Sequence, residues 1–218
     1  MTGGRAAFRA VVLDVDSTLC GLEGVDWLAR RRGPALADEV AALTTRAMAG
    51  ELALDAVYGR RLARIRPSAV EVAALADAYR ECLAPGAAAV LARLRAAGVA
   101  LHLVSGGLRE AILPLARSLD FAPAEVHAVG VRFDEAGAYA GFDEGSPLTT
   151  QEGKRAVIGA LGLAAPVLAV GDGATDLAMR PVVAAVAAFT GFIRRDAVVR
   201  AADLELPSFD DLLRLVLP

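Results

Sequence analysis

Hydrophobic and polar positions follow two patterns that alternate along the chain. Short apolar runs, which fit buried strands, are separated by longer stretches with apolar residues three or four positions apart, which fit helices. The expected strands are Ala10–Asp14, Val99–Val104, Pro166–Val170, Val182–Val186 and Ala202–Leu206. The expected helices are Ala87–Ala97, Leu108–Leu119, Gln151–Leu161, Thr175–Arg180 and Phe209–Leu217. This alternation predicts an α/β fold with a mainly parallel sheet and helices on both faces.

Two segments depart from that alternation. Between Leu22 and Cys82 the pattern is helical throughout, with breaks at Gly33-Pro34, Gly50 and Pro67-Ser68. Ser68 followed three residues later by Glu71 fits a capping box at the start of one of these helices. We therefore expect about four helices in a small cap domain, residues 22–82, inserted into a core formed by residues 1–21 and 83–218.

The second departure is a pair of apolar runs close together in the sequence. Val126–Phe133 and Ala138–Gly141 flank a short polar stretch that contains a glycine. Alternating runs joined by such a stretch predict a β-hairpin.

Composition narrows the function classes. The chain has 218 residues, of which 56% are hydrophobic, and a net charge of −3. The acidic balance argues against a nucleic-acid partner, and the short basic run Arg30–Arg32 is expected to be a solvated helix face. Cys20 and Cys82 are too few for a disulfide framework, and no apolar segment resembles a membrane span or export signal. We expect a cytoplasmic protein, a monomer or homodimer, with no membrane partner.

Two acids at the end of the first apolar run carry the strongest chemical signal. Alternation along a strand would put Asp14 and Asp16 on one face, at the carboxyl edge where open α/β sheets bind ligands. Such close carboxylates stay ionised most easily beside a hard cation such as Mg²⁺. One could serve as a nucleophile and the other as a proton donor, although a simple strand end with a helix cap is the alternative.

Three further features lie where later strands are expected to end. Ser105-Gly106-Gly107 offers a hydroxyl and backbone N–H groups to a phosphate. Lys154 lies early in an expected helix, and Gly171–Asp176 (Gly-Asp-Gly-Ala-Thr-Asp) carries two more acids in a glycine-rich loop. Brought together at one sheet edge, these groups are the equipment for phosphoryl transfer.

These four motifs resemble those of the haloacid dehalogenase-like phosphohydrolases. Within that superfamily, Glu23 and the stretches Thr45–Gly50 and Arg60–Ser68 resemble the phosphoserine phosphatases. The resemblance runs from about Val11 to Leu204. It implies a Rossmann-like parallel sheet core with an inserted helical-bundle cap, and Mg²⁺-dependent hydrolysis of O-phospho-L-serine in serine biosynthesis.

The resemblance also implies roles for residues of the core. Asp14 would attack phosphorus and form an aspartyl-phosphate, and Asp16 would protonate the leaving serine and then deprotonate water. The carboxylates of Asp14 and Asp172 and the backbone carbonyl of Asp16 would hold Mg²⁺, with Asp176 in support behind them. The phosphate-binding residues would be Ser105, Gly106 and Lys154, with Thr175 standing where many relatives have Asn.

In the cap, the resemblance implies that Glu23 meets the substrate ammonium and Arg61 its carboxylate, while Met48 walls the pocket. A zwitterion needs one partner of each sign, and Arg presents a planar fork to a carboxylate. The adjacent Arg60 is the alternative partner. Ala49 replaces a glycine common in relatives.

Two other functions stay open from the sequence. One is a sister phosphatase or phosphotransferase for another small phosphorylated metabolite, which would keep the core residues without depending on Arg61. The other is a phosphorylation switch of the receiver type, although its acids come from different strands. The histidines, His102 and His127, are expected to be structural.

Overall fold

The computed structural model describes residues 6–49, 51–52, 55 and 57–218. Its main feature is a six-stranded sheet in the order β3-β2-β1-β6-β7-β8, in which every neighbouring pair is parallel. The strands are β1 (Ala10–Leu13), β2 (Ala100–Leu108), β3 (Val126–Val129), β6 (Val167–Gly171), β7 (Ala185–Phe189) and β8 (Leu204–Leu206). The predicted parallel α/β fold is confirmed.

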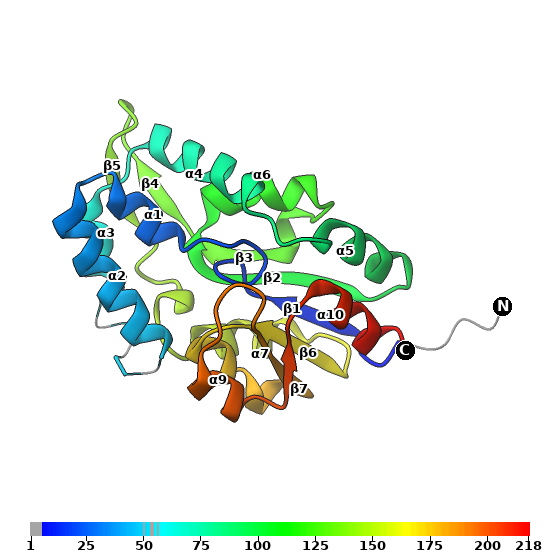
Figure 1. Ribbon diagram of the computed structural model, residues 1–218. Helices are drawn as coiled ribbons and strands as arrows, with labels where there is room; N and C mark the ends of the chain where they lie inside the picture. Colours follow the sequence, from blue (N-terminus) through cyan, green and yellow to red (C-terminus); the bar gives the residue numbers. More distant parts are fainter. Residues whose placement is uncertain (1–5, 50, 53–54, 56) are drawn as a thin grey trace.

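Helices cover both faces of this sheet. In Figure 1, α5 and α6 lie above it and α7 and α9 below. The helices that surround the sheet are α5 (Ala87–Ala96), α6 (Arg109–Ser118), α7 (Gly153–Leu161), α8 (Ala174–Leu177), α9 (Asp196–Ala201) and α10 (Phe209–Val216). Short 3₁₀ turns η2 (Pro123–Glu125), η3 (Pro147–Thr149) and η4 (Arg180–Val182) join them. Among the described residues, none of the helices has the length and apolar character needed to cross a membrane.

Four helices follow β1 in the described part of the chain: α1 (Gly24–Arg30), α2 (Pro34–Met48), α3 (Tyr58–Ile65) and α4 (Ala69–Glu81). The first three gather at one end of the molecule, whereas α4 packs along α6 (Figure 1). The capping box predicted at α4 is confirmed, since Glu71 N–H donates to Ser68 Oγ and Ser68 N–H donates to Glu71. Arg32 adds a bidentate ion pair to Glu71, so the basic run is not wholly a solvated face.

The segment Val126–Phe133 corrects our hairpin prediction. Its first half, β3, joins the main sheet beside β2, and only β4 (Val131–Phe133) and β5 (Tyr139–Phe142) form the antiparallel hairpin. Gly130 separates the two halves. The prediction failed because pairing with β2, a strand some twenty residues earlier, leaves no signal in the local pattern.

Other boundaries differ by a few residues. The strand expected at Val182–Val186 begins only at Ala185, because Pro181 lies in a 3₁₀ turn and has no N–H for a ladder bond. Strand β1 ends at Leu13, so Asp14 and Asp16 lie in the loop beyond it. Strand β2 continues through Leu108 and therefore includes Ser105–Gly107.

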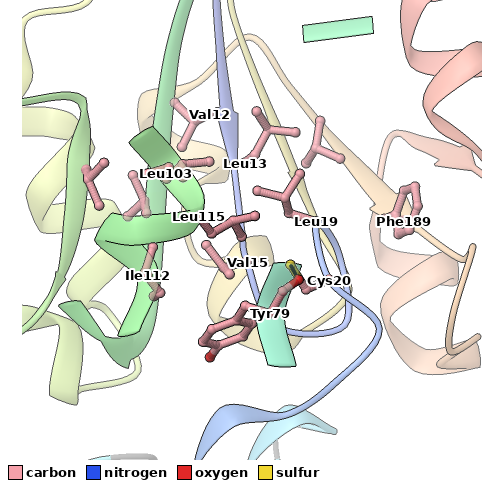
Figure 2. Close-up of a cluster of buried hydrophobic side chains, with 14 of the residues drawn as sticks. Val12, Leu13, Val15, Leu19, Cys20, Tyr79, Leu103, Ile112, Leu115 and Phe189 are labelled. Atoms are coloured by element: carbon pink, nitrogen blue, oxygen red, sulfur yellow. Dashed lines mark hydrogen bonds between the residues drawn. The ribbon is translucent and has the colours of Figure 1, made fainter. Parts of the chain in front are cut away.

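Buried side chains hold the loop after β1 in place. Figure 2 shows Val15 and Leu19 of this loop among side chains from β1, β2, α4 and α6. Both residues are fully buried, as is Leu13 at the end of β1. Since interiors pack as densely as crystals, the polar side chains between these apolar anchors have little freedom to move.

Candidate active site

Asp14 is buried directly beyond β1 and is held through one of its two oxygens. Oδ1 accepts the N–H of Val15 at 2.8 Å and lies 2.8 Å from Lys154 Nζ. Lys154 is the second residue of α7, and its side chain is almost fully buried. Burial works to lower the pKa of Lys154, but the charges of Asp14 and Asp176 outweigh it and raise that pKa. The lysine is therefore a fixed cation beside Asp14.

Asp176 sits behind this pair. Its Oδ1 accepts from Lys154 Nζ at 2.8 Å, and its Oδ2 accepts from the N–H of Gly173 at 3.0 Å. The carboxylate packs onto the backbone of Gly171, where a Cβ would lie 2.0 Å from Asp176 Cγ. Only glycine fits at the end of β6, which explains part of the glycine-rich loop seen in the sequence.

Asp172 is buried at the same edge of the sheet. The hydroxyl of Thr18 donates to its Oδ1 at 3.2 Å, and Arg195 Nη1 lies 2.8 Å from its Oδ2. That ion pair lacks hydrogen-bond geometry, so Oδ2 has no hydrogen-bond partner among the described residues. Burial, followed by the charges of Glu23 and Asp14, raises the pKa of Asp172 well above its usual range.

These three acids can hold a metal ion. Carboxylate oxygens of Asp14, Asp172 and Asp176 all lie within 4.8 Å of one another. Hard divalent cations prefer such oxygen ligands, and a cation would relieve the cost of ionising buried acids that face each other. Asp172 Oδ2, which has no hydrogen-bond partner among the described residues, could serve as one of these ligands. Since both oxygens of Asp176 are already engaged, Asp14 and Asp172 are the better placed ligands.

Asp16 lines the same cavity as Asp14 and Lys154. The hydroxyl of Tyr79, which comes from α4, donates to Asp16 Oδ1 at 2.5 Å. Burial and then the charge of Asp14 raise the pKa of Asp16 to about 7. An acid with such a pKa can both give and take a proton near neutral pH.

The Ser105-Gly106-Gly107 segment faces these acids across the cavity. Ser105 is buried, and its Oγ accepts the N–H of Gly107 at 3.0 Å. The hydroxyl of Tyr58, from α3, donates to the carbonyl of Gly106 at 2.7 Å. The expected phosphate cradle is thus tied to a cap helix.

Glu23 lies just before α1 and faces the acids of the core. It accepts from the hydroxyl of Ser17 at 2.7 Å and lies 3.6 Å from Arg195 Nη2. Burial and the charge of Asp16 raise the pKa of Glu23 to about 8. Ser17 has a left-handed backbone conformation with φ of 53°, a strained geometry that often accompanies functional loops.

Arg61 approaches the cavity from α3 and is only 4% exposed. Its Nη1 donates to Thr44 Oγ1 at 2.8 Å, and the Thr44 hydroxyl donates in turn to Asp26 at 2.5 Å. Its Nε has no hydrogen-bond partner among the described residues. Arg60, the alternative, is exposed and does not line this cavity.

The cavity thus joins most of the residues that the sequence singled out. The predicted residues that line it are Asp14, Asp16, Glu23, Arg61, Ser105, Gly106, Lys154 and Thr175. Met48 ends α2, but its side chain lies outside the described part of the structure. Asp172 and Asp176 do not line the cavity but lie close to Asp14 and Lys154, which do.

Sequence reasoning missed several residues of this site. Tyr58, Tyr79 and Arg195 contact Gly106, Asp16 and Asp172 respectively, from positions far away in the sequence. No motif marks them, because each is brought in by the packing of a helix or loop. Thr18 also belongs to the site, and its bond to Asp172 depends on strands β1 and β6 being adjacent.

Comparison with known proteins identifies the family. A family model described as haloacid dehalogenase-like hydrolase matches residues 8–180. The phosphoserine phosphatase of Bos taurus is 36% identical over 207 residues, which cover 94% of this chain and 91% of that protein. The chloroplastic phosphoserine phosphatase of Arabidopsis thaliana is 34% identical over 210 residues, or 94% of this chain and 70% of that protein.

A solved structure extends the similarity to the fold. It is a phosphoserine phosphohydrolase-like protein from Francisella tularensis, with a TM-score of 0.87 and 24% identity, covering 95% of this chain and 99% of the other. The family model spans most of the sequence, and the relatives align over nearly its whole length. The chain therefore belongs to the haloacid dehalogenase-like hydrolases.

Proposed function

We propose that this hydrolase is a Mg²⁺-dependent phosphatase that converts O-phospho-L-serine to L-serine and phosphate, the final chemistry of serine biosynthesis. One observation carries the substrate assignment: Glu23 and the buried Arg61 line the same cavity as Asp14 and Lys154. An acid and a guanidinium beyond a phosphoryl site suit an ammonium and a carboxylate on one small molecule. The phosphoserine phosphatases among the relatives support the same assignment.

The residues of the core suit a two-step displacement. Both contacts of Asp14 use Oδ1, which leaves Oδ2 to attack phosphorus and form an aspartyl-phosphate. As the ester P–O bond breaks, Asp16 gives its proton to the departing serine oxygen. Asp16 then takes a proton from water, whose oxygen attacks phosphorus, and the bond to Asp14 breaks to release phosphate.

The remaining residues of the site would bind the phosphoryl group and offset its negative charge. Lys154, together with Ser105 and Gly106, would hold the phosphoryl oxygens, and Thr175 lines the same space. Asp14, the backbone of Asp16 and Asp172 would hold Mg²⁺, which when bound offsets negative charge on the phosphoryl group. Asp176 would support this arrangement through Lys154.

The division of labour between segments is part of the proposal. Residues 1–21 and 83–218 would form the catalytic core, and residues 22–82 the cap that selects the substrate and excludes water. Met48 would contribute to the pocket wall. The free thiols of Cys20 and Cys82 are consistent with a reducing cytoplasm, which is our expected location.

Three substrates test the assignment. O-phosphoethanolamine lacks the carboxylate, and 3-phosphonooxypropanoate lacks the ammonium, but both keep an alkyl leaving group. We expect phosphate release to be fastest from O-phospho-L-serine, with kcat/KM at least about 30-fold higher than for either analogue, because each analogue lacks one of the two charged groups that Arg61 and Glu23 would bind. Equal values for all three would overturn the serine assignment in favour of a sister phosphatase.

The same assay tests the enzymatic mechanism. Release of many phosphates per chain in the presence of Mg²⁺, and its loss with EDTA, would support the proposal. Release of one equivalent and no more would indicate a receiver-type phosphorylation switch instead.

A further inference from the structure

Tyr79 is a fully buried tyrosine whose hydroxyl reaches the candidate proton donor. It lies near the end of α4 and donates to Asp16 Oδ1 at 2.5 Å, across 63 positions of sequence. The two residues come from different parts of the fold, since Asp16 follows the central strand of the sheet. A buried phenol beside a carboxylate stays protonated at neutral pH and acts as a donor.

The residues around Tyr79 leave room for its hydroxyl and hold its backbone. A Cβ on Gly24 would lie 2.2 Å from the Tyr79 oxygen, so any larger residue at position 24 would push the phenol away. On the other side, the Cys20 thiol donates to the backbone carbonyl of Tyr79 at 3.3 Å. Figure 2 shows Tyr79 beside Cys20 in the buried cluster. Both ends of the tyrosine are therefore fixed.

The contact makes the two oxygens of Asp16 unequal. Oδ1 is taken by Tyr79, whereas Oδ2 lies on the side of the phosphate cradle, 3.4 Å from where a Cβ on Gly107 would be. A carboxylic acid transfers its proton only from the oxygen that carries it. An Asp16 free to turn would present either oxygen, with its proton directed away from the substrate part of the time.

We propose that Tyr79 is a positioning residue that fixes Asp16 so that Oδ2, the oxygen facing the cradle, carries the proton for the leaving group. Tyr79 keeps its own proton throughout, and the proton delivered to the serine oxygen is that of Asp16. This inference rests on the proposed function, because it needs an alkyl leaving group that must be protonated as it departs.

The variant Tyr79→Phe keeps the ring and removes the donor. For O-phospho-L-serine we expect kcat/KM to fall about 10- to 100-fold, a part of the roughly 10²- to 10⁴-fold that general acid catalysis contributes, with KM unchanged within about twofold. Acetyl phosphate is similar in size, but acetate leaves without a proton. We therefore expect kcat/KM for acetyl phosphate to change less than about threefold.

Two further variants serve as controls for Tyr79→Phe. Asp16→Asn removes the proton itself and should show the same contrast in kcat/KM, which reports the first phosphoryl transfer, with a larger loss on O-phospho-L-serine. Its kcat should fall on both substrates, because Asp16 also takes the proton from water in the second step. Tyr139→Phe removes a tyrosine hydroxyl on the β4-β5 hairpin, outside the cavity, and should leave both substrates unaffected.

Equal losses of Tyr79→Phe on both substrates would overturn the inference, because they would indicate a general structural role. Unchanged activity on both would also overturn it. If Tyr79→Phe does not fold, Gly24→Ala displaces the hydroxyl instead and must show the same contrast. A wild-type enzyme that hydrolyses acetyl phosphate but not O-phospho-L-serine would instead refute the proposed function, which separates the two failures.

Discussion

Replacing Arg61 with alanine tests the substrate assignment most directly. The side chain is 4% exposed, and its Nε has no hydrogen-bond partner among the described residues. A substrate carboxylate would give this atom an acceptor in a site from which water is largely excluded. Burial lowers the pKa of Arg61, but an arginine stays charged under all ordinary conditions.

The expected size of the effect follows from this burial. Truncating one partner of a buried, hydrogen-bonded charge pair costs about 2–5 kcal/mol. At about 1.4 kcal/mol per factor of ten, kcat/KM for O-phospho-L-serine should fall about 30- to 4,000-fold. Arg61→Lys keeps the charge and loses the planar fork, so its loss should be intermediate.

Four rates make the assay selective: wild type and Arg61→Ala, each with O-phospho-L-serine and with O-phosphoethanolamine. The variant should lose its activity on the first substrate and little on the second, which has no carboxylate to bind. Arg60→Ala is the matched control, because Arg60 is adjacent on the same helix and exposed. Equal losses on both substrates, or a similar loss in the control, would refute our reasoning.

Four further predictions concern the core and the cap. Asp14→Asn should fold with an unchanged thermal midpoint and release no phosphate, and substantial residual turnover would remove Asp14 from the nucleophile role. Lys154→Met leaves Asp14 and Asp176 buried without their cation. The free energy of unfolding, measured with urea in the absence of metal, should therefore fall by about 3–5 kcal/mol. A loss below about 1 kcal/mol would contradict the contacts described. Asp176→Asn should weaken Mg²⁺ binding about 10- to 100-fold by calorimetry, whereas unchanged affinity would argue against its supporting role. Hydrogen bonding from Arg32 holds the pKa of Glu71 at about 2 instead of 4.5. The ionised Glu71 therefore stabilises the fold fully above pH 4.5, and this stabilisation is lost as the pH falls toward 2. Glu71→Gln should lower the free energy of unfolding by about 1 kcal/mol at pH 7 and by little near pH 2, and a difference independent of pH would refute this.

Much of the catalytic edge could be predicted because parallel strands bring their carboxyl ends together. Asp14 and Lys154 are 140 positions apart, yet Asp14 directly follows a strand and Lys154 lies in the first turn of a helix, and both elements have a strong local pattern. Once the alternation indicated a parallel sheet, the meeting of these groups followed from topology alone. The reasoning for Asp16 was less accurate, since β1 stops at Leu13 and the two acids share a cavity through their loop rather than through strand alternation.

The rest depended on contacts that no local pattern records. The pairing of β3 with β2 brings His127 within 3.3 Å of His102, where the sequence had suggested a hairpin strand. From the sequence, Tyr79 looks like an ordinary helix residue and Arg195 like an ordinary positively charged residue of a loop. Their positions depend on how α4 packs against α6 and how the chain leaves β7, which are tertiary properties.

Arg195 gives the two ends of the cavity a shared counterion. It pairs with Asp172 at the metal end and lies 3.6 Å from Glu23 at the amine end. In the proposed enzyme, a divalent cation held by Asp172 would weaken the contact of that acid with Arg195, and a substrate ammonium beside Glu23 would weaken the other contact. Each ligand would therefore change the contacts of the same guanidinium, and we expect metal and substrate to alter each other's affinity. Because thermodynamic coupling is reciprocal, each would change the affinity of the other by the same factor.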